Sequence, residues 1–433
     1  MSSAGLLDIL RRHKAGEAVG VTSVCSAHPL VIQAALEQAL ADDTIALVEA
    51  TSNQVDQYGG YTGMTPAQFR DLVLSITQRV GLPEPRVVLG GDHLGPNPWR
   101  HLPAETAMTE AAALVSAYVE AGFTKIHLDC SMTCADDVTP LGDGRVADRA
   151  ARLAVVAERA AESRFGASEL LYVVGTEVPV PGGAREAIDH LKPTSAQAAR
   201  ATLAAHQQEF RAGGVAAAWD RAVALVVQPG VEFDAWQVFE YSGAGTTDLR
   251  RIPDEWPLLV FEAHSTDYQQ PARLAELVRD HWAVLKVGPG LTFALREALF
   301  ALAAIENELV PASARSQLPE TLERVMLAEP KWWKTHYEGD AEELRIARRY
   351  SYSDRLRYYW AEPAVVDAQQ TLIANLRSRP VPLPLISAVL PDQYARIRAG
   401  RLDADPVAIA VDHVRDVLRG YSFACLPDAT VEG

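Results

Sequence analysis

The sequence is short of cysteine and of long apolar stretches. Its four cysteines are too few and too scattered for a disulfide framework, and Cys130 and Cys134 have no second Cys/His pair nearby at zinc-site spacing. We therefore expect reduced thiols in a cytoplasmic protein. No run of about 18 apolar residues occurs, and residues 1–20 lack the apolar segment of a signal peptide. Neither a membrane span nor secretion is expected.

Basic charge is also scarce. The chain has 40 Lys and Arg against 56 Asp and Glu, which gives a net charge of −16. This balance argues against nucleic acid or an acidic membrane surface as the main partner. Hydrophobic residues make up 48% and charged residues 22%, as in a soluble globular protein with a sizeable core. A length of 433 residues allows a large barrel with an appendage, or a few ordinary domains.

Short apolar runs rich in β-forming residues recur along the first three quarters of the chain. They occupy residues 19–25, 44–50, 86–91, 125–128, 170–175, 222–227, 258–261 and 283–287. Amphipathic or alanine-rich stretches separate them, and polar residues follow almost every run. Strands that alternate with helices predict an α/β protein, specifically a (β/α)₈ barrel over residues 1–309. A doubly wound open sheet is the alternative.

The last quarter of the chain has a different composition. Residues 310–316 read as a linker, and we expect residues 310–433 to form a helical extension packed on the barrel. This region contains an aromatic-basic cluster, residues 331–337 and 350–360. One interpretation is aromatic packing against the barrel. The other is binding of a phosphate or polyol by hydroxyl and guanidinium groups, with Ser353 and Arg355 as candidates.

The third apolar run leads into a chemically distinctive pair. Two glycines, Gly90 and Gly91, break the run, and Asp92 and His93 follow side by side. Active sites of parallel barrels lie at the C-terminal ends of the strands. A carboxylate there can move a proton, and an imidazole can bind a divalent metal.

In a barrel, His93, Glu177, Gln228 and His264 gather at the mouth with Asp92. His93, His264 and the carboxylate of Glu177, with Gln228 as a further candidate ligand, predict a divalent metal site. Such an ion polarises a carbonyl, and Asp92, with Glu177 as a second catalytic candidate, would transfer protons in a retro-aldol reaction. Lys286 ends the last strand, where barrels often bind phosphate; its alternative role is that of a Schiff-base lysine.

Other polar residues after the strands, or in the aromatic-basic cluster, are predicted to bind the substrate. They are Asn53, Asp129, Ser131, Ser265, Asp267, Lys286, Ser353 and Arg355.

Several segments together resemble the Z-type subunits of bacterial D-tagatose-1,6-bisphosphate aldolase. They are residues 23–30 (SVCSAHPL), 49–55 (EATSNQV), 58–64 (YGGYTGM), 90–97 (GGDHLGPN), 125–129 (KIHLD) and 350–355 (YSYSDR). The resemblance implies a (β/α)₈ barrel related to class II, metal-dependent aldolases. In those relatives an Asp-His pair supplies the acid/base and a metal ligand, which matches Asp92 and His93. The chain departs from them at Gln228, where the relatives have a third histidine; an amide oxygen can still be a ligand.

The resemblance implies metal-dependent retro-aldol chemistry in carbohydrate catabolism. The substrate would be a ketose or ketose phosphate of the tagatose/fructose type, and the outcome 4-epimerisation or aldol cleavage, with Zn, Mn, Co or Ni as the ion. The alternative is an accessory subunit that stabilises a separate catalytic aldolase subunit. Self-association into a homo-oligomer is left open. A tagatose-6-phosphate kinase is disfavoured because the sequence has no glycine-rich phosphate loop ending in Lys-Ser or Lys-Thr.

Overall fold

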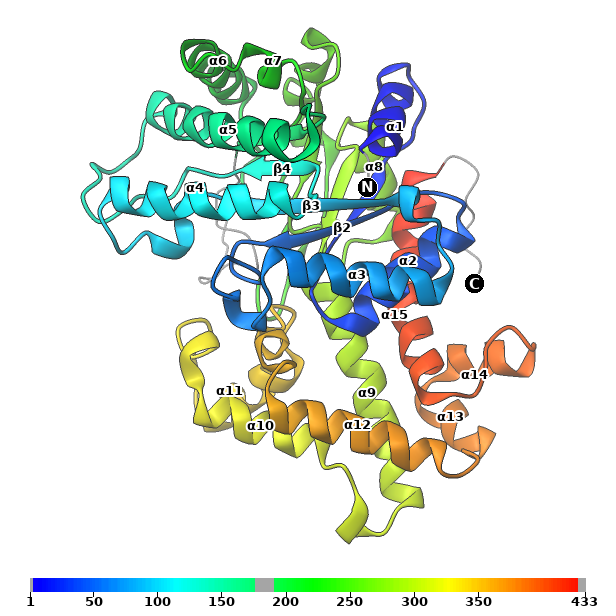
Figure 1. Cartoon of the computed structure of the whole chain (residues 1–433). Coiled ribbons are helices and arrows are strands. Elements are labelled where there is room, and N and C mark those ends of the chain that lie inside the picture. Colours follow the sequence, from blue (N-terminus) through cyan, green and yellow to red (C-terminus); the bar gives the residue numbers. More distant parts are fainter. Residues whose placement is uncertain (1–2, 176–190, 427–433) are drawn as a thin grey trace.

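Eight parallel strands close into a barrel in the computed structural model, which describes residues 3–175 and 191–426 (Figure 1). The hydrogen-bonded order around the barrel is β1-β10-β9-β6-β5-β4-β3-β2. The strands are β1 (Val21–Cys25), β2 (Ala46–Thr51), β3 (Val87–Leu94), β4 (Lys125–Leu128), β5 (Leu171–Gly175), β6 (Ala222–Val226), β9 (Val260–Ala263) and β10 (Val284–Val287). The predicted barrel is thereby confirmed, and the open sheet is excluded.

Helices that follow the strands cover the outside of the barrel. They are α2 (Pro29–Ala41), α3 (Pro66–Val80), α4 (Ala104–Glu120), α5 (Asp143–Phe165), α6 (Ala196–Ala212), the short α7 (Ala216–Trp219), α8 (Pro271–Arg279) and α9 (Pro289–Leu309). Their apolar faces and the outward faces of the strands form one continuous core. A hairpin of β7 (Glu232–Phe233) and β8 (Val238–Phe239), which the sequence did not predict, follows β6.

The N-terminal end of the barrel is closed by α1 (Ala4–Lys14). Leu6 and Leu10 pack with inward-facing strand residues such as Val21, Val223 and Val260 in a second apolar cluster. The barrel interior is therefore apolar near the N-terminal ends of the strands. Its polar side chains lie near the C-terminal ends.

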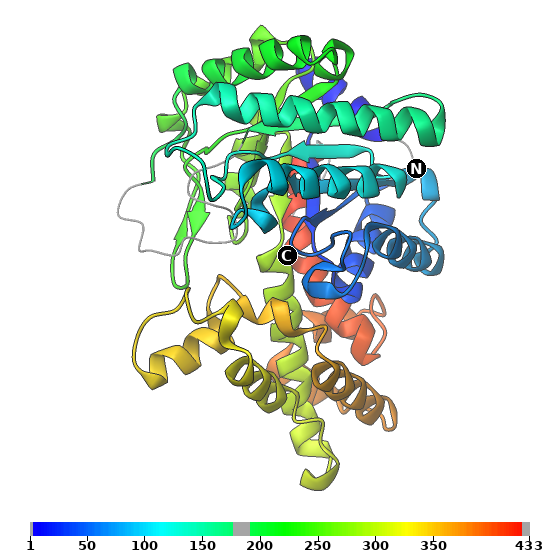
Figure 2. The same ribbon diagram turned by 60° about the vertical axis from the view of Figure 1, so that its left-hand side comes forward.

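The region after residue 309 is helical, as predicted. It consists of α10 (Leu318–Ala328), α11 (Ala341–Tyr350), α12 (Pro363–Arg377), α13 (Leu383–Val389), α14 (Pro391–Arg398) and α15 (Pro406–Cys425). Most of these helices gather on one side of the barrel, around the far half of α9 (Figures 1 and 2). The last helix, α15, instead packs against α2, α8, α9 and β1. The division at residue 309 stays a prediction, and α15 joins the end of the chain to the ring of barrel helices.

Two hydrogen bonds tie the loops of the barrel mouth to the C-terminal region. The backbone N–H of Tyr352 donates to the carbonyl of Ala235 in the β7–β8 turn at 3.0 Å, and the Tyr268 hydroxyl donates to the carbonyl of Tyr352 at 2.6 Å. The aromatic-basic cluster is thereby held beside the C-terminal ends of the strands. Within the described residues, none of the helices has the length and apolar character needed to cross a membrane.

Candidate active site

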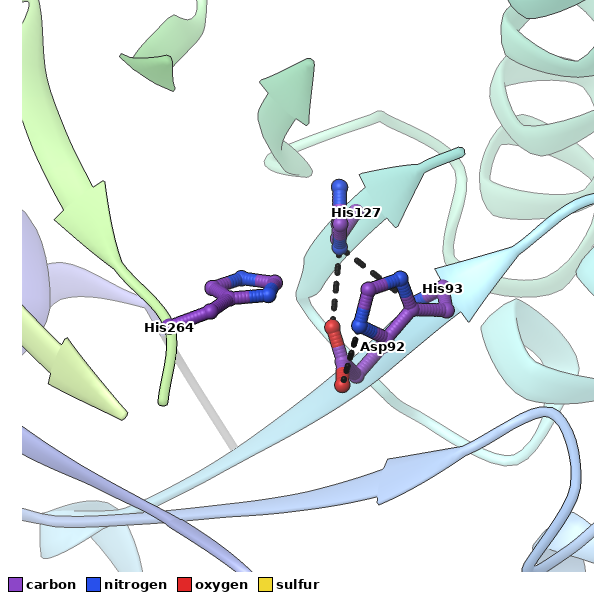
Figure 3. A group of neighbouring side chains, drawn as sticks. All are labelled: Asp92, His93, His127 and His264. Atoms are coloured by element: carbon purple, nitrogen blue, oxygen red, sulfur yellow. Dashed lines mark hydrogen bonds and ion pairs between the residues drawn. The ribbon is translucent and has the colours of Figure 1, made fainter. Parts of the chain in front are cut away.

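Three imidazoles and one carboxylate converge at the C-terminal end of the barrel (Figure 3). Asp92 and His93 come from β3, His127 from β4, and His264 directly follows β9. One donor atom from each of the four residues lies within 4.8 Å of the others. The ring of His93 is 4.9 Å from both the His127 and the His264 ring, measured between centroids. Nitrogen donors with one carboxylate are the ligands that Zn²⁺ and similar divalent ions prefer.

An irregularity in β3 brings Asp92 and His93 to the same side. Neighbouring side chains of a strand normally point to opposite faces. Here His93 has a left-handed backbone conformation, with φ at 49°, and the pairing of β3 with β4 shifts between Gly91 and Leu94. A bulge of this kind re-aims a side chain. The strand also runs on to Leu94, past the predicted end at residue 91, so the pair lies within β3 rather than after it.

Asp129 orients His93. Its Oδ2 atom lies 2.8 Å from Nδ1 of His93, and its Oδ1 atom accepts the hydroxyl of Ser131 at 2.6 Å. Burial raises the pKa of Asp129, but the hydrogen bond and charge of His93 outweigh it, and the pKa is lowered overall. Asp129 is therefore ionised at neutral pH and fixes the ring so that Nε2 faces the cluster, 3.6 Å from Oδ2 of Asp92.

The other two imidazoles are held differently. His127 lies with Nδ1 2.8 Å from Oδ1 of Asp92 and Nε2 3.0 Å from the carbonyl oxygen of Gly175. Nε2 of His264 lies 2.9 Å from a carboxylate oxygen of Glu262. Burial and the nearby charge of Lys286 lower the pKa of His264 to about 3, so its imidazole is neutral and able to act as a ligand.

A layer of buried ion pairs lies beside the histidines, inside the barrel. Nζ of Lys125 contacts Glu49 at 2.6 Å and Glu262 at 2.7 Å. Lys286 pairs directly with Asp92 and lies 3.6 Å from Glu49. This layer explains one glycine of β3: a Cβ atom on Gly90 would be only 2.6 Å from Cγ of Glu49.

The state of Lys286 bears on its predicted roles. Burial lowers the pKa of its amine, but Asp92, Glu49 and Glu262 outweigh burial and raise the pKa well above the usual range. Lys286 is therefore a protonated ammonium ion, whereas Schiff-base formation requires a neutral amine. The carboxylates around Lys286 neutralise the positive charge that would otherwise attract a phosphate.

The cluster opens into a cavity of about 150 Å³. Most of the predicted substrate-binding positions line it: Asn53, Asp129, Ser265, Asp267 and Lys286, together with Asp92, His93 and His264. Cys25, Gln54, Tyr61, Phe233, Arg357 and Tyr358 complete much of the wall and were not predicted. Ser131 acts through Asp129 and is not part of the wall. Glu177 and the loop around it lie outside the described residues.

The side-chain oxygen of Gln228 does not face the histidine cluster, contrary to the prediction that it is a metal ligand. Its amide oxygen accepts the backbone N–H groups of Gly230 at 2.8 Å and Val231 at 2.9 Å, and so shapes the turn after β6. The third imidazole of the cluster is His127, which the sequence reasoning missed because it sits inside an apolar run. A signal was present: Lys125 and His127 alternate with Ile126 and Leu128, which pack in the outer core.

The aromatic-basic cluster reaches the cavity through residues other than those predicted. Nε of Arg355 donates to the carbonyl of Trp332 at 2.6 Å, and its guanidinium lies 4.5 Å from the ring centre of Tyr358. Ser353 contributes its backbone carbonyl to Arg357. Arg357 and Tyr358 line the cavity instead, which places Arg355 and Ser353 in the layer behind.

Residues 6–426 match the family model described as D-tagatose-1,6-bisphosphate aldolase subunit GatZ/KbaZ-like. The chain belongs to this family. Its function is accordingly related to that of tagatose-bisphosphate aldolase, and the family named from the sequence motifs is confirmed.

Solved structures give one strong likeness and weaker ones. A protein from Sinorhizobium meliloti 1021, described as a probable tagatose 6 phosphate kinase, is 47% identical, with a TM-score of 0.86 over 94% of this chain and 100% of that one. The YdjI aldolase from Escherichia coli K12 is 10% identical, with a TM-score of 0.41 over 86% of this chain and 98% of that one. Fructose-bisphosphate aldolase from Campylobacter jejuni is 13% identical, with a TM-score of 0.41 over 87% and 93%.

Proposed function

We propose that this chain catalyses metal-dependent retro-aldol chemistry on a ketose or ketose phosphate of the tagatose/fructose type. The observation that carries the proposal is the convergence of Asp92 with three imidazoles, two of which, His93 and His264, line a cavity of about 150 Å³ together with Asp92. Family membership supports the substrate class.

The donor set fits a divalent ion. His93, His127 and His264 offer nitrogen, and their donor atoms lie close enough to share one ion beside Asp92. An ion such as Zn²⁺, Mn²⁺, Co²⁺ or Ni²⁺ bound there would supply Lewis-acid polarisation of the ketose carbonyl. Glu177 remains a candidate ligand or acid/base.

Asp92 is the proposed acid/base. Burial raises the pKa of its carboxyl, but His93, Lys286 and His127 outweigh burial and hold the pKa well below its usual range. The group is therefore a carboxylate that can accept the proton of the C4 hydroxyl as the C3–C4 bond breaks. Returning the proton after re-addition gives the original sugar or, if the aldehyde fragment has turned over, its 4-epimer. Release of the fragment would make the reaction an aldolase reaction.

The alternative is an accessory role, and the family's description as an aldolase subunit favours it. Against it stands the cost of the buried charges. Ion pairs inside a protein are often no better for stability than apolar residues of the same volume. Lys125, Lys286, Glu49, Glu262 and Asp92 are nevertheless all buried around the site. A chain that only stabilised a partner would gain little from them.

The test uses the purified chain alone, without a His tag. EDTA-treated protein is reloaded with Mn²⁺, Co²⁺, Ni²⁺ or Zn²⁺ and incubated with fructose, tagatose, their 6-phosphates and the bisphosphates, and NMR follows the products. Asp92→Asn should lower turnover by about 10²–10⁴, the usual contribution of a positioned acid/base, while an exposed carboxylate variant, Asp340→Asn, should leave it unchanged. If the wild type turns over no sugar with any ion, yet both variants still raise the activity of a co-expressed aldolase subunit, the accessory role is correct.

A further inference from the structure

The last strand of the barrel leads directly into a helix whose first residues face the mouth. Gly288 precedes α9, Pro289 is its first residue, and Gly290 follows. Backbone N–H groups at such a helix N-terminus form an anion-binding position, and barrels commonly hold a substrate phosphate there.

In this chain a side chain of the protein itself fills that position. Oδ1 of Asp267, from the loop after β9, accepts the N–H of Gly288 at 3.0 Å and that of Gly290 at 2.7 Å. A Cβ atom on Gly290 would be 3.1 Å from the same oxygen. The carboxylate therefore lies close against the helix end, where a phosphate oxygen would otherwise bind.

Asp267 also belongs to the wall of the cavity, together with Asp92, His93 and His264. Its side chain differs from ordinary helix caps such as Asp340, which accepts the N–H groups of Glu342 and Glu343 in solvent. Asp267 is only 2% exposed, and burial, partly offset by the N–H groups of Gly290 and Gly288, raises its pKa to about 6. A neutral Ser, Thr or Asn would cap α9 without the cost of burying a charge. The presence of a carboxylate here therefore indicates a role in the cavity.

The cations of the cavity wall compensate for this charge only in part, through the guanidinium of Arg357. Lys286 is paired with Asp92, as described above. The guanidinium of Arg357 donates to the carbonyls of Ser353 and Asp354 and, at 3.0 Å, to the hydroxyl of Tyr358. A phosphate dianion brought to this end would meet a carboxylate of like charge, whereas a sugar hydroxyl would meet a hydrogen-bond acceptor.

We propose that Asp267 is a specificity-determining residue that replaces a substrate phosphate at the N-terminus of α9. The adjoining end of the cavity then takes a ketose carbon that carries a free hydroxyl and rejects one that carries phosphate. This inference rests on the proposed function for the identity of the sugar, and on Asp267 alone for the exclusion of phosphate.

The experiment has one arm that depends on activity. kcat/KM is measured for tagatose, tagatose 1-phosphate and tagatose 6-phosphate with the metal-loaded wild type, Asp267→Asn, Asp267→Ser and the control Asp340→Asn. The wild type should disfavour at least one of the two phosphate esters. Both Asp267 variants should shift the ratio toward that ester by at least about 10-fold, roughly the effect of 1.4 kcal/mol, and Asp340→Asn should not. Equal loss for all three sugars in both variants would overturn the proposal.

The second arm needs no turnover. Binding of inorganic phosphate is measured by calorimetry on the metal-free proteins. Asp267→Ser, which removes the charge and opens the position, should gain phosphate binding that the wild type and Asp340→Asn lack. If the wild type turns over no sugar but Asp267→Ser gains this binding, the proposed function fails and the role of Asp267 stands. If Asp267→Asn and Asp267→Ser are folded and neither gains phosphate binding, the role of Asp267 fails by itself.

Discussion

Replacing Asp129 by asparagine should weaken metal binding without removing a ligand. The carboxylate of Asp129 lies 2.8 Å from Nδ1 of His93 and is fixed in turn by the hydroxyl and N–H of Ser131 at 2.6 and 3.2 Å. It is buried and ionised, so it holds the ring with Nε2 toward the cluster. An amide presents a weaker acceptor and no charge.

The size of the effect follows from this geometry. Partners that orient a metal-bound histidine typically contribute about 10–100-fold in metal affinity, or roughly 1.4–2.7 kcal/mol. We expect Asp129→Asn to fall in that range. Ser131→Ala removes support from Asp129 while leaving the bond to His93 in place, so it should cost less, about threefold or below. His93→Ala removes a ligand and should cost more than either.

The assay is a competition titration. EDTA-treated protein is titrated with Zn²⁺ or Mn²⁺ in the presence of a chromophoric chelator, and circular dichroism checks that each variant is folded. The ordering His93→Ala, then Asp129→Asn, then Ser131→Ala supports the site. If Asp129→Asn binds metal as tightly as the wild type while His93→Ala does not, Asp129 does not orient the ligand. If all three bind metal like the wild type, the metal centre is assigned wrongly.

Two further outcomes concern stability. Glu232 is buried, which raises the pKa of its carboxyl to about 8, and the N–H of Phe233 offsets this only in part. Because the folded state holds this proton more tightly, the contribution of Glu232 to stability should be fully present below pH 4.5 and be lost by up to about 1.4 kcal/mol per pH unit between 4.5 and 8. Urea unfolding of the wild type and of Glu232→Gln across this range should differ by that slope, and equal slopes would contradict the explanation. Lys125→Met leaves Glu49 and Glu262 without their shared cation and should cost about 3–5 kcal/mol in the same assay, whereas the exposed Lys334→Met should cost almost nothing; a loss below about 1 kcal/mol for Lys125→Met would show that Lys286 alone suffices.

The elements of the barrel could be predicted because local patterns encode them. Apolar runs of strand length, separated by amphipathic stretches, sufficed to place all eight strands. The positions of Asp92 and His264 could also be anticipated, since polar residues at the ends of buried strands of a barrel meet at one mouth. The hairpin of β7 and β8 was missed because each of its strands has only two residues and leaves almost no periodic signal.

The membership of the site was harder to predict because it depends on side-chain direction. Gln228 and His264 look equivalent in sequence, because each follows a buried strand. The amide oxygen of Gln228, however, accepts a backbone N–H group in the turn that follows it instead of facing the cavity. His127 looks like part of a strand, but its alternation with outward-facing residues turns it toward Asp92. A single position along a strand separates these outcomes, and a one-residue change of phase moves a side chain to the opposite face.

By itself, the sequence determined the class of fold and the family, since composition, strand periodicity and the motif around Asp92 and His93 are local properties. Only the tertiary structure decided which groups meet. The bulge in β3 turns His93 toward Asp92, closure of the barrel brings His127 and His264 to them, and the loop after β9 places Asp267 on the first residues of α9. These contacts join residues far apart in the chain, and their geometry depends on the register and closure of the whole barrel, which no short segment encodes.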